Sequence, residues 1–301
     1  MVFLFSVRAG IKSLLHRQLF EKPTLPENID LKSKTAIVTG SNTGIGLECA
    51  RQLLDLRLSR LILAVRNDAK GQQAREGLAK THPSLPGDAI EVWKLDMEDY
   101  ASVTAFAERA KALARLDIIV LNAGVAKTVY KRAAATGHEE TIQVNMLSTA
   151  LLALLLPVVK AKGAASSSSG RLVVMQSDTS SWAKFREKGH VPLLPALDDE
   201  RKFDRADHYF TSKLILQLFM IELARRVPAS VAAVVTMPNP GWTYGTGLGK
   251  GSVTMAEKII SFPNRILGSS PSAGARVVTT GAVAFGPEAH GQYIEDGKLQ
   301  P

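Results

Sequence analysis

Short apolar runs alternate along the chain with stretches whose apolar residues recur every three or four positions. The runs predict strands at residues 35–39, 60–65, 90–95, 116–121, 171–175, 230–237 and 292–294. The periodic stretches predict helices at residues 47–56, 68–80, 100–114, 139–160, 209–226 and 272–285. Apolar strands that alternate with helices form a parallel sheet covered on both faces. We therefore expect an α/β fold with a single domain over residues 34–301.

Residues 1–33 precede the first expected strand and are interpreted as a leader. At helical spacing four apolar side chains of this leader share one face: Val7, Ile11, Leu14 and Leu15. Arg8 and Lys12 lie on another face. Such an amphipathic segment can bind a membrane surface, the body of the protein or a partner subunit. Peripheral membrane contact through residues 1–20 is one of these three alternatives.

The composition, 46% apolar and 22% charged, is that of an ordinary globular protein. The formal net charge is +9, but Lys and Arg form no block of five or more, so we expect no nucleic-acid partner. The single cysteine, Cys49, fits a reducing compartment such as the cytoplasm. His138 has no other ligand types around it at metal-binding spacing, so no metal is expected.

A glycine-rich loop follows the first expected strand and opens into the first helix of the domain. Glycines at Gly40, Gly44 and Gly46 allow a tight turn, a close approach of backbone to phosphate and close helix packing. We expect the whole loop to bind a dinucleotide: Gly40, Ser41, Asn42, Thr43, Gly44, Ile45 and Gly46. The sheet is then a Rossmann-like doubly wound one.

The residue after the second expected strand indicates which dinucleotide binds. An NAD enzyme places Asp or Glu there to hold the ribose hydroxyls. Here Val65 is followed by Arg66, and the first carboxylate is Asp68. A guanidinium can form a two-pronged contact with a 2′-phosphate, so NADP(H) is favoured over NAD(H).

Tyr209 and Lys213 are four residues apart in an expected helix and so lie on the same face, one turn apart. A free phenol titrates near pH ~10 and is a poor proton carrier at neutral pH. A neighbouring ammonium favours the phenolate and lowers the pKa of the phenol. The pair is therefore a candidate acid/base device.

With the glycine loop, Asn122-Ala123-Gly124 and the Tyr209/Lys213 pair in this order, the chain resembles the short-chain dehydrogenase/reductase family. The resemblance covers residue 34 to the C-terminus. The leader, the segment 64–67 and the ending at 286–294 are similar to the retinol-dehydrogenase-like and fungal secondary-metabolism branches.

The resemblance implies further cofactor-binding residues: Asp96, Met97, Asn122, Ala123, Gly124, Tyr209, Lys213, Pro240, Gly241 and Thr243. The family often has a threonine four residues after the glycine of the Asn-Pro-Gly segment. That position is Gly245 here, so Thr243 and Thr246 both stay open as the contact.

The resemblance also implies a catalytic set of Asn145, Ser177, Tyr209 and Lys213. In it, Ser177 hydrogen-bonds the carbonyl oxygen, Tyr209 donates the proton, and Lys213 lowers the pKa of Tyr209 while binding the nicotinamide ribose. Asn145 would hold a water that links Lys213 to solvent. This set serves an NADPH-dependent carbonyl reductase, an NADP-dependent alcohol dehydrogenase in the reverse direction, or, without turnover, a dinucleotide-binding protein. Family members commonly form homodimers or homotetramers.

Two segments are particular to this chain. Thirty-two residues separate Ser177 from Tyr209, where compact family members have roughly a dozen, so the insertion at about 180–207 is expected to form one wall of the substrate site. The glycine-rich segment at about 242–270 is expected to form a lid. Aromatic side chains in both segments favour a bulky, largely apolar aldehyde or ketone as the small-molecule substrate.

Overall fold

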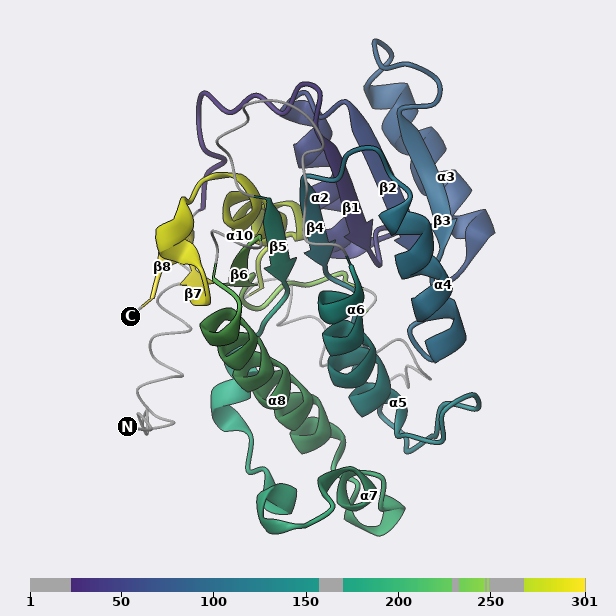
Figure 1. Ribbon diagram of the computed structural model, residues 1–301, viewed down its shortest axis with the longest axis vertical. Helices are drawn as coiled ribbons and strands as arrows, with labels where there is room; N and C mark the ends of the chain where they lie inside the picture. The colour runs from purple at the N-terminus through teal and green to yellow at the C-terminus, as the bar shows by residue number, and fades with distance from the viewer. Residues whose placement is uncertain (1–22, 157–169, 229–232, 247, 249–267, 301) are drawn as a thin grey trace.

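The computed structural model describes residues 23–156, 170–228, 233–246, 248 and 268–300. These residues form an eight-stranded sheet with the order β3-β2-β1-β4-β5-β6-β7-β8 (Figure 1). The strands are β1 (Thr35–Thr39), β2 (Arg60–Val65), β3 (Ile90–Lys94), β4 (Ile118–Leu121), β5 (Arg171–Val174), β6 (Val234–Asn239), β7 (Gln292–Glu295) and β8 (Lys298–Leu299). Every neighbouring pair is parallel except β7 and β8. The expected doubly wound α/β fold is confirmed.

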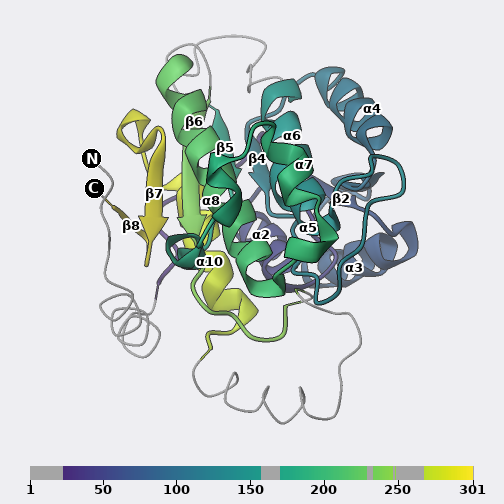
Figure 2. The ribbon, with the colours of Figure 1, turned by 90° about the horizontal axis from the view of Figure 1, so that it is seen from below.

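Helices cover both faces of the sheet, as the buried strands require (Figures 1 and 2). One layer holds α2 (Gly44–Asp55), α3 (Asp68–Thr81) and α10 (Pro271–Val283). The other holds α4 (Tyr100–Lys111), α5 (Glu140–Ile142), α6 (Thr149–Leu155) and α8 (Arg205–Arg226). Each layer buries its own apolar cluster, with Leu53 and Val278 in the first and Phe106 and Met220 in the second. The strands therefore stay fixed, and their carboxyl ends can carry a site.

The long helix expected at 139–160 is interrupted within its described part. Between α5 and α6 the segment η1 (Gln143–Ser148) is a π-helix. Its Asn145 side chain turns to the backbone of Val125, which it contacts through both the N–H and the carbonyl at 2.8 Å. Widened turns of this kind frequently occur at functional sites.

The sixth strand lies later in the chain than expected, because β6 runs to Asn239 instead of ending at Met237. Pro238 lacks an N–H, yet its carbonyl accepts from the Gln176 N–H at 2.9 Å, so the strand continues through it. The short strand β8 was not expected, since two residues carry no detectable alternation.

The described part of the expected leader, residues 23–33, packs on the domain. Leu31 is buried, and its N–H donates to the Leu56 carbonyl at 2.8 Å. Arg276 of α10 donates to the Pro23 carbonyl at 3.3 Å. The apolar face expected at residues 7–15 lies outside the described residues, as does most of the expected lid. No helix among the described residues is long and apolar enough to cross a membrane.

The insertion before Tyr209 folds into short helices below α8 (Figure 1). They are η2 (Asp178–Trp182), η3 (Arg186–Gly189), α7 (Leu193–Leu197) and η4 (Glu200–Lys202). Asp198 joins this insertion to the loop before α5, because its carboxylate accepts from the Glu139 N–H at 2.8 Å and lies 2.7 Å from His138 Nδ1. The Asp198 carbonyl accepts from the Tyr130 hydroxyl at 2.7 Å. The insertion is thus tied to a second loop that borders the cleft described below.

Candidate active site

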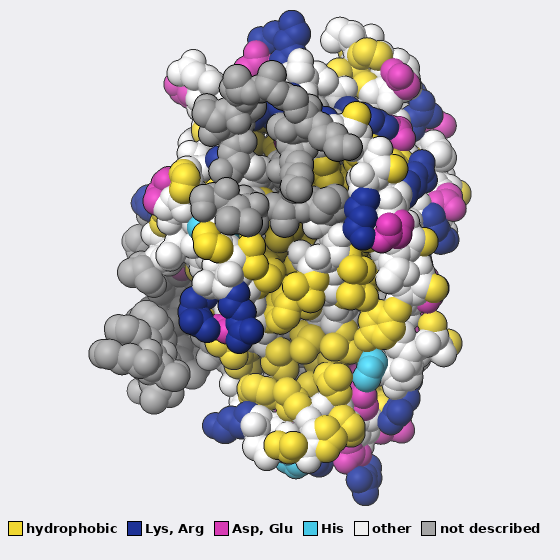
Figure 3. All heavy atoms as spheres, in the orientation of Figure 1, with side chains coloured by type: hydrophobic (Ala, Val, Ile, Leu, Met, Phe, Trp, Pro, Cys, Tyr) yellow, Lys and Arg dark blue, Asp and Glu magenta, His cyan; other side chains and the backbone are white. Residues whose placement is uncertain are grey.

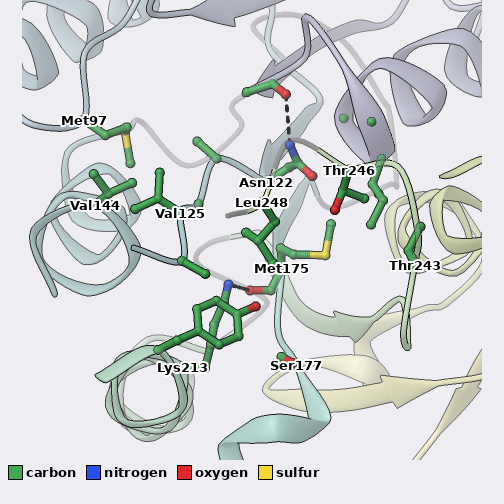
Figure 4. Close-up of a pocket in the computed structure, with 18 of the residues that line it drawn as sticks. Met97, Asn122, Val125, Val144, Met175, Ser177, Lys213, Thr243, Thr246 and Leu248 are labelled. Atoms are coloured by element: carbon green, nitrogen blue, oxygen red, sulfur yellow. Dashed lines mark hydrogen bonds between the residues drawn. The ribbon is translucent and has the colours of Figure 1, made fainter. Parts of the chain in front are cut away.

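A cleft of about 1610 Å³ opens at the carboxyl ends of β1, β2, β4, β5 and β6, where chain order in the sheet reverses between β1 and β4. This is the position at which open α/β sheets bind their ligands. The glycine loop, the segment after β4, the end of β5, the first turns of α8 and the segment after β6 all line it. Figure 4 shows Asn122, Met175, Ser177 and Lys213 around the same space.

The glycine loop connects β1 to α2 and fits the close packing that its glycines predict. Gly40 and Gly44 have φ of +64° and +61°, which other residues rarely adopt. A Cβ on Gly46 would lie 2.4 Å from Asn122 Nδ2 and 2.6 Å from the Gly40 carbonyl oxygen. Of the loop residues expected to bind the dinucleotide, all but Ser41 line the cleft; Ser41 is buried and donates to the Val38 carbonyl at 2.8 Å.

The Asn-Ala-Gly segment after β4 supports this loop. Asn122 Nδ2 donates to the carbonyls of Thr39 and Gly40 at 2.8 and 3.2 Å. The Thr39 hydroxyl in turn accepts from the N–H groups of Asn122 and Ala123 at 3.0 and 2.9 Å. The ends of β1 and β4 are therefore locked together under the loop, with Gly124 beside Asn145 Oδ1.

Tyr209 and Lys213 lie in the first turns of α8 and line the cleft together. The helix begins at Arg205 because Asp204 caps it, accepting from the N–H groups of Ala206 and Asp207 at 3.1 Å. Lys213 is buried, and its Nζ donates to the Met175 carbonyl at 3.0 Å (Figure 4). The expected placement of the pair on one helical face is thus what the structure shows.

Burial shifts the two pKa values in opposite directions. It raises the pKa of the Tyr209 phenol to about 12, against a lowering contribution from a Ser177 hydrogen bond. It lowers the pKa of the Lys213 ammonium to about 8. Both shifts favour the uncharged form, as desolvation does. The expectation that Lys213 lowers the pKa of Tyr209 stays a prediction, because desolvation of the phenol dominates the net shift of that pKa in the protein alone.

Ser177 and Asn145 complete the expected set. Ser177 follows β5 and lines the cleft, and its hydroxyl lies 2.8 Å from Thr179 Oγ1. Asn145 is buried in the π-helical turn, where Nδ2 also donates to the Ser212 hydroxyl of α8 at 3.1 Å. Asn145 therefore ties the segment after β4 to the helix that carries Tyr209 and Lys213. It does so without itself lining the cleft.

Arg66 and Asp96 border the other end of the cleft, with Met97 beside them. Arg66 Nη1 lies 2.6 Å from Glu98 Oε1. Asp96 Oδ1 accepts from the Glu98 N–H at 3.0 Å, which fixes the turn after β3. No carboxylate follows β2 directly, as the sequence indicates.

Pro240, Gly241, Thr243 and Thr246 line the cleft after β6. A Cβ on Gly44 would lie 3.4 Å from Thr246 Cα, so Thr246 borders the glycine loop. Thr243 lies near α10, where a Cβ on Gly274 would lie 2.7 Å from its hydroxyl. Both threonines therefore border the cleft, and Gly245 does as well.

A protein-family model described as "short chain dehydrogenase" matches residues 34–187 of this chain. The chain belongs to the short-chain dehydrogenase family. It is 44% identical over 301 residues to the short-chain dehydrogenase fogG of Aspergillus ruber, covering 97% of this chain and 85% of that protein. It is 40% identical over 304 residues to the short chain dehydrogenase opdN of Penicillium oxalicum, covering 97% and 96%. The family expected from the three motifs is confirmed, and these relatives are fungal.

Solved structures agree with this fold. Salutaridine reductase from Papaver somniferum has a TM-score of 0.61 at 20% identity, with 86% of this chain and 99% of that chain covered. A short-chain dehydrogenase from Escherichia coli CFT073 complexed with NADPH has a TM-score of 0.62 at 20% identity, with 92% and 100% covered. The protein is accordingly an oxidoreductase of the short-chain dehydrogenase family with its Rossmann-like domain.

Three cleft residues of this short-chain dehydrogenase were not expected from the sequence. Glu98 pairs with Arg66, and Glu140 pairs with Lys127 and Lys131. Gln176 is the third, since it is 1% exposed and neither of its amide atoms has a hydrogen-bond partner among the described residues. Its position directly before Ser177 was the available signal. Within the described ranges, no group of three or more His, Cys, Asp and Glu is placed to hold a metal.

Proposed function

We propose that the protein is an NADPH-dependent carbonyl reductase that transfers hydride to a bulky, largely apolar aldehyde or ketone. The observation that carries the proposal is the meeting of Ser177, Tyr209 and Lys213 at one cleft that also contains the glycine loop. Hydride chemistry belongs to the cofactor, so the protein need only position the reactants and supply a proton.

The cleft fits a dinucleotide. Its floor is a glycine turn with two positive φ angles, held so tightly that Gly46 has no room for a Cβ. Bound NADPH would supply the hydride, and the glycine loop, residues 122–124 and Lys213 would hold it. Arg66 and Lys70 line the end where no carboxylate follows β2, which favours a 2′-phosphate. Similar folds from Shigella flexneri and Escherichia coli are complexed with NADP and NADPH, which supports the same choice here.

Tyr209 is assigned as the proton donor. A phenol with a pKa of about 12 keeps its proton at neutral pH, as a general acid must. Ser177 would donate to the carbonyl oxygen. Trp182, five residues further along the chain, packs its ring edge-on against that of Phe210. Lys213 holds the end of β5 through the Met175 carbonyl and would bind the nicotinamide ribose.

The reverse reaction, alcohol oxidation, would use the same residues, with the Tyr209 phenolate as the base that accepts the alcohol proton. A dinucleotide-binding protein without turnover would not require Ser177, Tyr209 and Lys213 to meet at the cleft.

The walls of the cleft set the substrate class. Side chains with large apolar surfaces line it on three segments: Val129, Tyr130, Trp182, Trp242, Tyr244 and Leu248. From the insertion at 180–207 only Trp182 lines the cleft, and Asp178 and Thr179 line it just before the insertion begins. Phe203, from its far end, instead packs on Tyr130 and His208, with ring centroids 5.6 and 4.8 Å apart. The insertion therefore acts partly as a wall and partly as a support for the Tyr130 loop.

We also propose that the enzyme is a cytoplasmic homodimer or homotetramer. Figure 3 shows hydrophobic side chains gathered over α6 and α8. Leu154, Leu218 and Ile221 of these helices are 58%, 53% and 44% exposed. A contiguous apolar face of this kind favours contact with a second copy.

Measuring NADPH oxidation against a panel of aldehydes, ketones and polycyclic quinones tests the activity. We expect turnover on at least one bulky carbonyl, and a fall of about 100-fold or more in Tyr209→Phe with NADPH affinity retained. Turnover above a tenth of wild type in that variant would refute the assigned proton donor. Tight NADPH binding with no turnover on any compound would favour the binding protein.

A further inference from the structure

The end of the cleft near Arg66 contains a dense group of charges. Four cations and two carboxylates line it: Arg66, Lys70, Lys127, Lys131, Glu98 and Glu140. A 2′-phosphate is a dianion at neutral pH, so its affinity for this end depends on which cations are free to contact it.

Most of these cations already have partners. Glu140 is 1% exposed and pairs with both Lys127 and Lys131. Arg66 is paired with Glu98 at 2.6 Å. In the described part of the chain, Lys70 alone among the four has no carboxylate within ion-pair distance. The Arg66 guanidinium, which was expected to contact the 2′-phosphate, is therefore already paired with Glu98.

The carboxylate of that pair is the fixed partner. The Glu98 side chain is 19% exposed, against 60% for Arg66. The Glu98 N–H donates to Asp96 Oδ1, which anchors the turn. A second cation, Lys127, lies 4.0 Å from the same Glu98 oxygen. A phosphate that contacts Arg66 must therefore either share it with Glu98 or displace that carboxylate, and it meets a like charge in both cases.

We infer that Glu98 is a specificity-determining residue that limits the affinity for NADP(H) by competing with the 2′-phosphate for Arg66. This inference rests on the proposed use of NADPH. NAD(H) has no 2′-phosphate, so Glu98 does not compete with it for Arg66. Glu98 therefore reduces the difference in binding affinity between NADP(H) and NAD(H).

Glu98→Gln tests this in the full-length protein. Dissociation constants for NADPH and NADH, from nicotinamide fluorescence, need no substrate. We expect the NADPH constant to fall about three- to fivefold, the upper part of the range for a partly exposed charge contact, and the NADH constant to change less than about twofold. The gain should shrink as salt is raised.

Two further variants control for side effects. Glu108→Gln removes the same charge from the exposed Glu108–Lys111 pair on α4, outside the cleft, and should leave both constants unchanged. Glu98→Ala removes the carboxylate without adding an amide donor, so a gain shared with Glu98→Gln reflects relief of competition. Thermal melts of each variant identify any loss of folding.

An unchanged or weakened NADPH constant in both Glu98 variants overturns the inference, since Glu98 would then only position Arg66. Arg66→Ala separates this from failure of the proposed cofactor. If Arg66→Ala removes the NADPH preference while the Glu98 variants leave it alone, only the inference about Glu98 is lost. If Arg66→Ala leaves the ratio of the two constants unchanged, the assignment of NADPH through Arg66 fails as well.

Discussion

Replacing Lys213 with Met should stabilise the protein near neutral pH while removing a group that the proposed reaction requires. Lys213 is 4% exposed, and its Nζ donates to the Met175 carbonyl at 3.0 Å. No carboxylate lies within ion-pair distance of it among the described residues. An ammonium desolvated without a counter-charge is costly, and a methionine fills a similar volume without that cost.

The size of the effect follows from the pKa of Lys213, which burial lowers from 10.5 to about 8. At about 1.4 kcal/mol for each unit of pKa, the buried ammonium lowers the free energy of unfolding by about 3 kcal/mol near pH 7. The unfolded chain keeps the proton up to about pH 10.5, whereas the folded chain releases it near pH 8. The destabilisation is therefore complete below pH 8 and is relieved as the pH rises toward 10.5.

Urea unfolding at two pH values measures this directly through tryptophan fluorescence, since Trp93 is buried against Phe106. Between about pH 7 and pH 9.5 the free energy of unfolding of the wild type should rise by about 2 kcal/mol relative to Lys213→Met. Comparing the two pH values removes the contributions of methionine packing and of the lost hydrogen bond to the free energy of unfolding, because neither depends on pH. Lys80→Met, at an exposed position of α3, should show no such dependence.

A wild type and a Lys213→Met variant with parallel pH dependences would refute the reasoning. The ammonium would then keep an ordinary pKa in the folded protein, and burial at this position would not disfavour its charge.

Three other predictions follow from the packing. Gly46→Ala should lower the free energy of unfolding by about 2 kcal/mol or more and abolish NADPH binding, because its Cβ would lie 2.4 Å from Asn122 Nδ2. Gly77→Ala, with open space around it, should be neutral or slightly stabilising in thermal melts. Leu218→Asp should reduce the mass found by light scattering to that of one chain, whereas Val191→Asp, at a 98% exposed site off α8, should not; equal masses would contradict the proposed interface. Asp198→Ala should lower the free energy of unfolding by about 1–3 kcal/mol, because it leaves the Glu139 N–H without its acceptor. Asp199→Ala, which removes an ion pair with the exposed Arg201, should lower it by less than about 1 kcal/mol; similar losses for both variants in urea unfolding would argue against the role of Asp198.

The sequence is sufficient to predict the sheet and the floor of the site, because their signals are local. Seven strands follow from apolar runs, and the glycine turn follows from spacing within eight residues. The carboxyl ends of the parallel strands face one way, which places Ser177 after β5 at the same edge as the glycine loop. That Tyr209 meets Ser177 there was implied by the family resemblance. Resemblance to the family adds the roles of these residues, which periodicity does not contain.

What was missed depends on contacts between distant residues. Arg66 and Glu98 are 32 positions apart, and nothing in either neighbourhood indicates that they pair. The π-helical turn at Asn145 depends on the Val125 backbone reaching its side chain. The desolvation that dominates the pKa shifts of Tyr209 and Lys213 is not visible in their spacing, which shows only that the two groups are near each other.

The protonation states of this pair bear on the proposed reduction. Desolvation raises the pKa of Tyr209 and lowers that of Lys213. The phenol therefore carries its proton at neutral pH and can protonate a carbonyl oxygen that gains negative charge on accepting hydride. That transfer leaves the negative charge on the Tyr209 oxygen, so Tyr209 must regain a proton before the next turnover, and alcohol oxidation passes through the same phenolate in reverse. The Lys213 ammonium, still protonated at pH 7 with a pKa of about 8, is the neighbouring charge that would stabilise this phenolate.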